Sequence, residues 1–283
     1  MDHHNNPETI VQRAGAIDGP LLIFGGVYSN LQALDAMQEV AERAGFSPNR
    51  IICTGDIVGY CADPEACVQR VKNWGIRAIA GNVELQLREG EEDCGCNFDE
   101  GSRCDLLSRQ WYPFAQSQLS ADSLDWMRTL PHHLQLTLGG QSVYVLHGSW
   151  HNPSEFVFQS TPWPVKAANF EATQADIILG GHCGLPFLDQ KEGKTWLNAG
   201  VIGMPANDGT TRVWYAILDV NSSGEVICTH YALTYDFATA AERMRVNRLP
   251  ASYALTLSTG IWDNCDILPE TETNAQGHPL FES

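Results

Sequence analysis

Four short segments each place a side chain that can bind a metal directly after an apolar, strand-like run. They are Cys53-Thr54-Gly55-Asp56, Gly81-Asn82, Leu146-His147-Gly148 and Gly180-Gly181-His182. A carboxylate, an amide oxygen and two imidazoles are hard or borderline ligands, and the carboxyl ends of parallel strands meet at one edge of a sheet. We therefore predict that one divalent cation is bound by Asp56, Asn82, His147 and His182.

Each of these residues also has a purely structural interpretation. Asp56 and Asn82 both follow a glycine and fit tight turns, and His147 fits a core histidine whose hydrogen bonds are satisfied. The sequence nevertheless predicts an exposed strand end for His147 and a tight, glycine-flanked turn for His182. Four candidate ligands at matching strand ends favour the metal site over four separate turns.

Alternating strands and helices would position these ligands. Residues 21–24 and 51–54 are short apolar runs of the kind that form strands buried on both faces, and apolar residues recur at helical spacing over 31–41. Asn30 and Asp63 are natural N-caps for the helices that follow them. Further strands are predicted over residues 76–80, 132–138, 142–146, 175–179, 194–197, 212–219 and 225–231, and helices over 105–129 and 236–247.

Length and composition indicate a globular α/β protein. The 283 residues are 43% hydrophobic, which is enough for a large core, and we expect a disordered segment over 1–19, one domain over 20–250 and a C-terminal extension over 251–283. The N-terminus lacks a basic and apolar leader, and no run of about 18 apolar residues occurs. These features predict a soluble, cytoplasmic protein that does not contact a membrane.

The formal charge of −17 argues against a nucleic-acid polymer as partner, because an acidic protein repels a polyanion. A small phosphate ester remains compatible with this charge, since a bound cation dominates the field of its own pocket.

The candidate ligands also resemble a known family. In order and spacing, Gly55-Asp56, Gly81-Asn82, His147 and Gly181-His182 are similar to the second to fifth motifs of the calcineurin-like metallophosphoesterases. The resemblance covers roughly residues 20–220. Asp63-Pro64-Glu65 and residues 198–205 are similar to a bacterial subgroup of small phosphodiesterases and dinucleotide-polyphosphate hydrolases. The resemblance implies a four-layer α/β/β/α sandwich and a divalent cation, namely Mn, Fe, Zn or Mg.

Departures from the family pattern affect one of its two metal sites. Gly26 and Tyr28 stand where the family has an aspartate and a histidine, and Gly184 stands where it has a last histidine. By resemblance, this site keeps only the bridging Asp56, whereas the other site keeps all four ligands. Tyr28 is then either an aromatic filler of the lost site or a phenolate ligand.

Catalytic candidates are less well defined. Val83 replaces the histidine that assists the leaving group in the family, so protonation of the leaving group would fall to His151 or solvent. Glu84 and His151, with Asn152, are predicted to line the pocket as acid, base or phosphate contacts.

The nine cysteines are an odd number, and we expect them to be reduced. Cys94, Cys96 and Cys104 lie in a polar segment after Asn82, and Cys183 adjoins His182. They are incidental residues of a compact loop, soft ligands for a second metal, or partners in a regulatory disulfide.

Three functions are compatible with this sequence. The first is a hydrolase acting on a small phosphomonoester, phosphodiester or nucleotide. The second is a metal- or nucleotide-binding module without catalysis, and the third is a metalloenzyme with cysteine as a substitute ligand. The sequence leaves the oligomeric state open.

Overall fold

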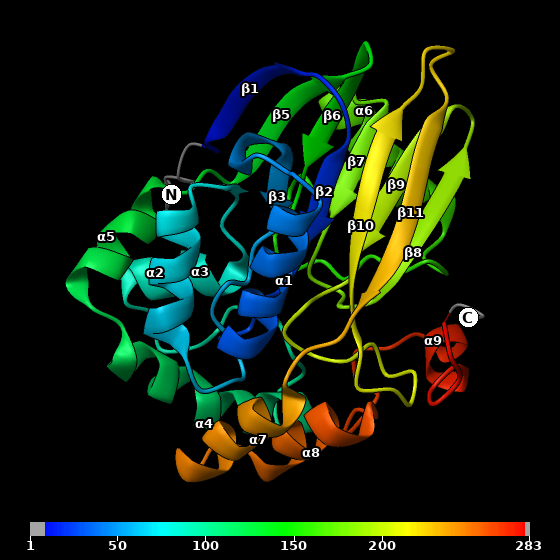
Figure 1. Cartoon of the computed structure of the whole chain (residues 1–283). Coiled ribbons are helices and arrows are strands. Elements are labelled where there is room, and N and C mark those ends of the chain that lie inside the picture. Colours follow the sequence, from blue (N-terminus) through cyan, green and yellow to red (C-terminus); the bar gives the residue numbers. More distant parts are fainter. Residues whose placement is uncertain (1–8, 281–283) are drawn as a thin grey trace, which may run out of the picture.

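Two mixed β-sheets face one another at the centre of the molecule (Figure 1), and the computed structural model describes residues 9–280. The first sheet has the strand order β11 (Val226–Leu233), β10 (Val213–Val220), β2 (Leu21–Phe24), β3 (Ile51–Cys53) and β4 (Arg77–Ala78). The second has the order β1 (Val11–Ile17), β5 (His133–Leu138), β6 (Gln141–Val145), β7 (Ile177–Gly180), β9 (Lys194–Ala199) and β8 (Pro186–Lys191).

The central strands are apolar because both of their faces are covered. In β2, Leu21 and Ile23 pack into the core between the two sheets, whereas Leu22 and Phe24 pack against the helices. Successive side chains of a strand point to opposite faces, so a fully apolar run belongs between two packed layers.

Helices cover the outer faces of both sheets. The core outside the first sheet includes side chains from seven helices, and a separate core outside the second sheet includes Phe170 of α6 (Trp163–Thr173). The seven are α1 (Leu31–Arg43), α2 (Pro64–Trp74), α3 (Asn82–Glu89), α4 (Arg103–Gln118), α5 (Ala121–Thr129), α7 (Phe237–Val246) and α8 (Ala251–Thr259). The remaining described helices are η1 (Pro48–Arg50) and α9 (Glu270–Asn274). This arrangement confirms the predicted α/β/β/α sandwich.

Several local predictions are confirmed. Asn30 caps α1 by accepting a hydrogen bond from the backbone N–H of Ala33 at 3.1 Å. β5 and β6 form the predicted antiparallel hairpin across Gly139 and Gly140.

Two predictions were wrong. Asp63 precedes α2 but does not cap it with its side chain, because its carboxylate binds the guanidinium of Arg243 instead. The helix predicted over 105–129 is two helices, α4 and α5, separated at residues 119–120. The C-terminal extension contains α8 and α9.

The N-terminal segment also differs from its prediction. Residues 1–8 lie outside the described part of the chain, but β1 is an ordered edge strand rather than part of a disordered tail. It pairs in parallel with β5, beginning with Val11 opposite His133. The strand pattern in its sequence is weak, because within β1 only Ile17 is buried. The formation of β1 therefore depends on pairing with a strand that is distant in the sequence.

Within residues 9–280, every helix is too short or too polar to cross a bilayer.

Candidate metal centre

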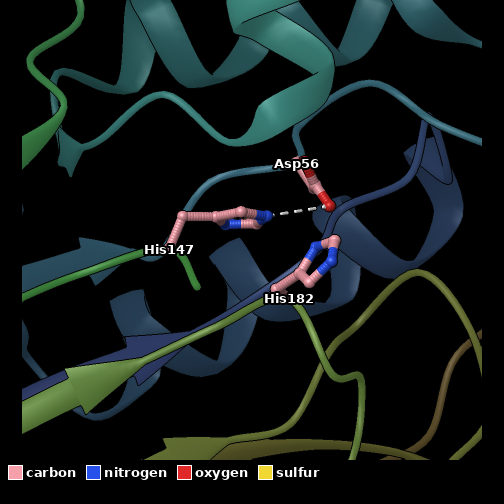
Figure 2. Close-up of side chains that lie close together, drawn as sticks. All are labelled: Asp56, His147 and His182. Atoms are coloured by element: carbon pink, nitrogen blue, oxygen red, sulfur yellow. Dashed lines mark ion pairs between the residues drawn. The ribbon is translucent and has the colours of Figure 1, made fainter. Parts of the chain in front are cut away.

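Three of the predicted ligands converge where the two sheets meet (Figure 2). Asp56 follows β3 of the first sheet, while His147 and His182 follow β6 and β7 of the second. One ligand atom from each of these three buried residues lies within 4.8 Å of the other two. The carboxyl ends of strands from both sheets therefore supply a cluster suited to a cation.

Glycines allow the backbones of these turns to approach closely. A Cβ atom at Gly55 would lie 2.6 Å from the backbone nitrogen of Gly81 and 2.7 Å from Nδ1 of His147. A Cβ at Gly81 would overlap the Asp56 carboxylate. Asp56 and His182 both have left-handed backbones, with φ of 56° and 60°, and residues held in this region are often functional.

Glu84 ties the Asp56 turn to the start of α3. Its carboxylate accepts hydrogen bonds from the backbone N–H groups of Asp56 at 2.8 Å, Val58 at 3.0 Å and Gly81 at 2.9 Å. Burial, and then the negative charge of Asp56, raise the pKa of this carboxyl group. The three bonds satisfy backbone donors, so the geometry gives Glu84 a positioning task. Its place three residues after the N-cap Gly81 is the sequence signal for such a capping arrangement.

His147 is held in one orientation by the backbone. Its Nδ1 lies 2.7 Å from the carbonyl oxygen of Thr54, and since that oxygen can only accept, Nδ1 carries the proton. Nε2 then faces Asp56 Oδ2 at 3.2 Å and Asn82 Oδ1 at 3.0 Å. His147 is buried rather than at an exposed strand end, so that detail of the sequence prediction was wrong.

Asn82, the first residue of α3, completes the group of four. Its Nδ2 donates to the carbonyl oxygen of Cys94 at 2.8 Å, which turns Oδ1 toward His147. The polar loop after α3 therefore orients a candidate ligand, although its own sulfurs are not among the cluster atoms.

The charges of the site stabilise one another. Burial alone would raise the pKa of Asp56 and lower that of His147, but their ion pair reverses both shifts, so the pKa of Asp56 is lowered and that of His147 is raised. Burial, and then the charge of His147, lower the pKa of His182 to about 3, so His182 is a neutral imidazole at pH 7.

Buried polar atoms without hydrogen-bond partners indicate where a cation would fit. Asp56 Oδ1 and both ring nitrogens of His182 are buried and make no hydrogen bond of good geometry, although the backbone of Ser154 lies near the His182 ring. Buried polar atoms without partners are costly, and a divalent cation between them would satisfy them. The donor set of one carboxylate, one amide and two imidazoles fits Mn, Fe or Zn and is compatible with Mg.

Aromatic side chains lie beside two of the positions where the family has ligands, Gly26 and Gly184. A Cβ at Gly26 would lie 2.5 Å from Cζ of Tyr28, so the buried Tyr28 ring occupies the space into which a side chain at position 26 would extend. A Cβ at Gly184 would contact the Trp262 ring at 3.5 Å. Burial, followed by the nearby Tyr60 and Asp56, raises the pKa of Tyr28 well above its usual value. The Tyr28 ring packs edge to face against Tyr60 with 4.7 Å between ring centroids, so the packing favours Tyr28 as a filler.

Other predicted residues lie away from the cluster. His151 and Asn152 are exposed, and neither lines the cavity next to Asp56 and His182. Cys94 and Cys96 are paired as a disulfide, so the expectation of reduced thiols was wrong for these two. Burial raises the pKa of Cys104 to about 11 and that of Cys183 to about 12, so both thiols stay protonated near neutral pH.

Two contributors to the site were missed from the sequence. Phe156 stacks on His182 with ring centroids 4.2 Å apart, and Trp262 reaches the site from the C-terminal extension. The sequence around each of them contains no motif that would indicate a place in the site. Both come from loops whose positions only the tertiary structure defines.

The two facing sheets and their ligands at strand ends define a metallophosphoesterase type of fold and site. Sequence comparison agrees, because the calcineurin-like phosphoesterase superfamily domain matches residues 23–223. The chain belongs to this family.

Individual relatives are distant. An uncharacterised protein of Methanocaldococcus jannaschii is 24% identical over 245 residues, which cover 81% of this chain and 93% of the relative. The crystal structure of a metallophosphoesterase from Sphaerobacter thermophilus is 25% identical, with a TM-score of 0.65, and covers 87% of this chain and 100% of its own. A hypothetical protein of Pyrococcus horikoshii has 18% identity and a TM-score of 0.69 over 87% of this chain and 100% of its own, and supports the fold alone.

Proposed function

We propose that the protein is a hydrolase that cleaves a small phosphate ester with one divalent cation bound by Asp56, Asn82, His147 and His182. The observation that carries this proposal is the set of buried, unpartnered atoms on Asp56 and His182, which lie beside Nε2 of His147. The family membership of the chain supports the reaction class.

The residues of the site have separate tasks in this reaction. A bound divalent cation supplies polarisation of the phosphoryl oxygen and lowers the pKa of a water molecule. Thr54 and Glu84 position the candidate ligands. The Thr54 carbonyl fixes the His147 tautomer, and Glu84 fixes the Asp56 turn. Hydrogen bonds to the residues that bind a metal orient those residues in known sites.

Protonation of the leaving group needs another donor, because Val83 stands where the family has the histidine that assists this step. His151 is exposed and does not line the cavity, so the geometry favours solvent or the hydroxyl of Tyr28, which does line it. The raised pKa of Tyr28 keeps that hydroxyl protonated but makes it a weak acid, so solvent is the favoured donor.

A binding module without hydrolysis is the second candidate function. It is favoured by Gly26, Tyr28 and Gly184, which stand where the family has ligands of a second metal, because a single cation cannot contact both the attacking and the leaving oxygen as two cations do. A cysteine-ligated second metal is not supported, since Cys94 and Cys96 are paired and Cys183 is a buried, protonated thiol.

Metal content and hydrolysis, measured together, test the proposal. The full chain would be purified without chelators or a histidine tag and analysed by plasma mass spectrometry. It would then be assayed with Mn on phenyl phosphate and bis-phenyl phosphate. Asp56→Ala and His182→Ala should lose the metal and the activity, whereas the exposed His278→Ala should keep both.

The outcomes separate the candidates. About one metal per chain with hydrolysis that both variants lose supports the hydrolase. One metal without hydrolysis supports the binding module, and absence of metal even after incubation with Mn contradicts both. The cytoplasmic location and the exclusion of nucleic-acid polymers stay predictions from composition.

A further inference from the structure

A cavity of about 80 Å³ adjoins the metal centre, which is several times the ~10–15 Å³ that one water molecule requires. Asp56 and His182 form part of its wall, and most of the remaining wall is aromatic or aliphatic. The aromatic residues that line it are Tyr28, Tyr60, Phe98, Phe156, Tyr253 and Trp262.

These aromatic rings support one another. Tyr60 meets Tyr28 edge to face at 4.7 Å between ring centroids and meets Tyr253 in the same way at 4.9 Å. The indole Nε1 of Trp262 donates to the carbonyl oxygen of Pro205 at 2.7 Å. Rings that are fixed in this way form a preorganised apolar surface, which reduces the entropy lost when a ligand binds.

The charges around this cavity are unsuited to an extended anion. Among the described residues that line it, none is a lysine or arginine, and two, Asp56 and Asp263, are acidic. Arg103 lies nearby but is paired with Asp263, with 2.5 Å between Nε and Oδ2. A chain of further phosphates, or another anionic group, would enter an acidic and apolar space without a cationic partner.

The relative position of the metal centre and the aromatic wall indicates which kind of ligand the cavity accepts. A phosphoryl group at Asp56 and His182 would direct the organic part of its ester along the aromatic wall, since both residues belong to the same cavity. We propose that this cavity binds an uncharged aromatic group on the phosphate ester and selects against substrates with additional negative charge. The inference rests on the proposed function, because it takes the phosphoryl group to lie at the metal centre.

Phosphonates test this inference without turnover, because their C–P bond resists hydrolysis. The probes are phenylphosphonate, propylphosphonate and 2-carboxyethylphosphonate, and their binding to the Mn-loaded full chain would be measured by calorimetry. The propyl and carboxyethyl compounds have similar length but differ by one negative charge. We expect phenylphosphonate to bind about tenfold more tightly than propylphosphonate, and the carboxyethyl compound to bind most weakly.

Two variants test whether the aromatic wall of the cavity causes the preference for phenylphosphonate. Tyr253→Leu keeps an apolar side chain but removes one ring, and should weaken phenylphosphonate binding by about 2- to 10-fold while leaving propylphosphonate binding unchanged. Tyr231→Leu is the matched control, because Tyr231 lies on β11, is 40% exposed and does not line the cavity.

The outcomes distinguish failure of this inference from failure of the proposed function. Equal binding of the phenyl and propyl compounds, or tightest binding of the carboxyethyl compound, would overturn the aromatic selectivity and leave phosphoryl binding intact. Equal weakening by Tyr231→Leu would also overturn it. If none of the three phosphonates binds, the proposed function itself fails and this inference with it.

Discussion

His147 is the residue at which a proton and a metal compete. In the metal-free protein its imidazole lies between the oxygens of Asp56 and Asn82, and the charge of Asp56 raises its pKa. At a pH below that raised pKa, the imidazolium places a positive charge in the middle of the site. A cation must displace the proton on Nε2, since only an unprotonated nitrogen can bind a metal.

Mn affinity should therefore depend on pH. Below the raised pKa of His147, each unit of decrease in pH should weaken Mn binding by about tenfold, and above that pKa the affinity should level off. Titrations followed by electron paramagnetic resonance between pH 6 and 9 would measure this. An affinity that stays constant over the range would show that Nε2 does not bind the metal.

Gly81 tests the close approach of the two turns. Its φ of −81° suits alanine, so Gly81→Ala adds only a methyl group, which would overlap the Asp56 carboxylate. We expect Mn affinity to fall by at least about tenfold as Asp56 is displaced. Gly90→Ala is the control, because Gly90 has open space around it but a left-handed φ of 77°. It should cost about 1 kcal/mol of stability and leave Mn binding unchanged; equal losses of Mn binding in both variants would contradict the steric explanation.

At the scale of elements, the start of α3 is fixed to the Asp56 turn by the Glu84 carboxylate. Glu84→Ala leaves three buried backbone N–H groups without an acceptor, and we expect a loss of about 3 kcal/mol or more in the free energy of unfolding. Urea unfolding would measure it, with the exposed Glu39→Ala of α1 as a control that changes stability little.

Glu84→Gln separates this task from catalysis. A positioning role predicts that stability and metal affinity fall together with activity, because the amide has one acceptor oxygen for three donors. Full stability and metal content with lost hydrolysis would instead support the acid or base role predicted from the sequence.

The ligand positions were predictable because their signals are local. Each of the strands β3, β6 and β7 contains an apolar run, and a glycine turn with Asp56, His147 or His182 follows it. The position of Asn82 was predictable in the same way, although the helix that it begins was not, since α3 starts only four residues after β4 ends.

Long-range pairings account for the predictions that were wrong. Asp63 has every local feature of an N-cap, yet Arg243, 180 residues later, binds its carboxylate. His147 is buried by residues from other strands and loops, which its own neighbours do not reveal. The aromatic wall of the cavity likewise combines Tyr60 with Tyr253 and Trp262, which are far apart in the sequence.

At the scale of the whole molecule, acid should destabilise the fold partly through His133, which lies in β5 away from the metal centre. Burial, and then the neighbouring His132, lower the pKa of His133 to about 4, and its ring stacks on Trp150. The unfolded chain binds a proton near pH 6.5, whereas the folded chain does not until about pH 4. The contribution of neutral His133 is therefore present above pH 6.5 and is lost as the pH falls from 6.5 to 4.

His133→Phe should flatten this pH dependence while keeping the aromatic stack. The difference between the two proteins in the free energy of unfolding should change by at most about 3 kcal/mol between pH 7.5 and 4. Urea unfolding at several pH values would measure it, with the exposed His278→Gln as a control. Parallel curves for wild type and His133→Phe would exclude His133 as a source of acid sensitivity.

The edge strand β1 has a consequence for how the chain folds during synthesis. Its partner β5 begins at residue 133, 122 residues after Val11, and the two pair in parallel. At about 5–20 residues per second, a ribosome needs roughly 6–24 s to make the intervening chain. β1 therefore emerges long before it can pair with β5. We expect the exposed Gln12 and Arg13 side chains to disfavour its pairing with other nascent chains during this interval.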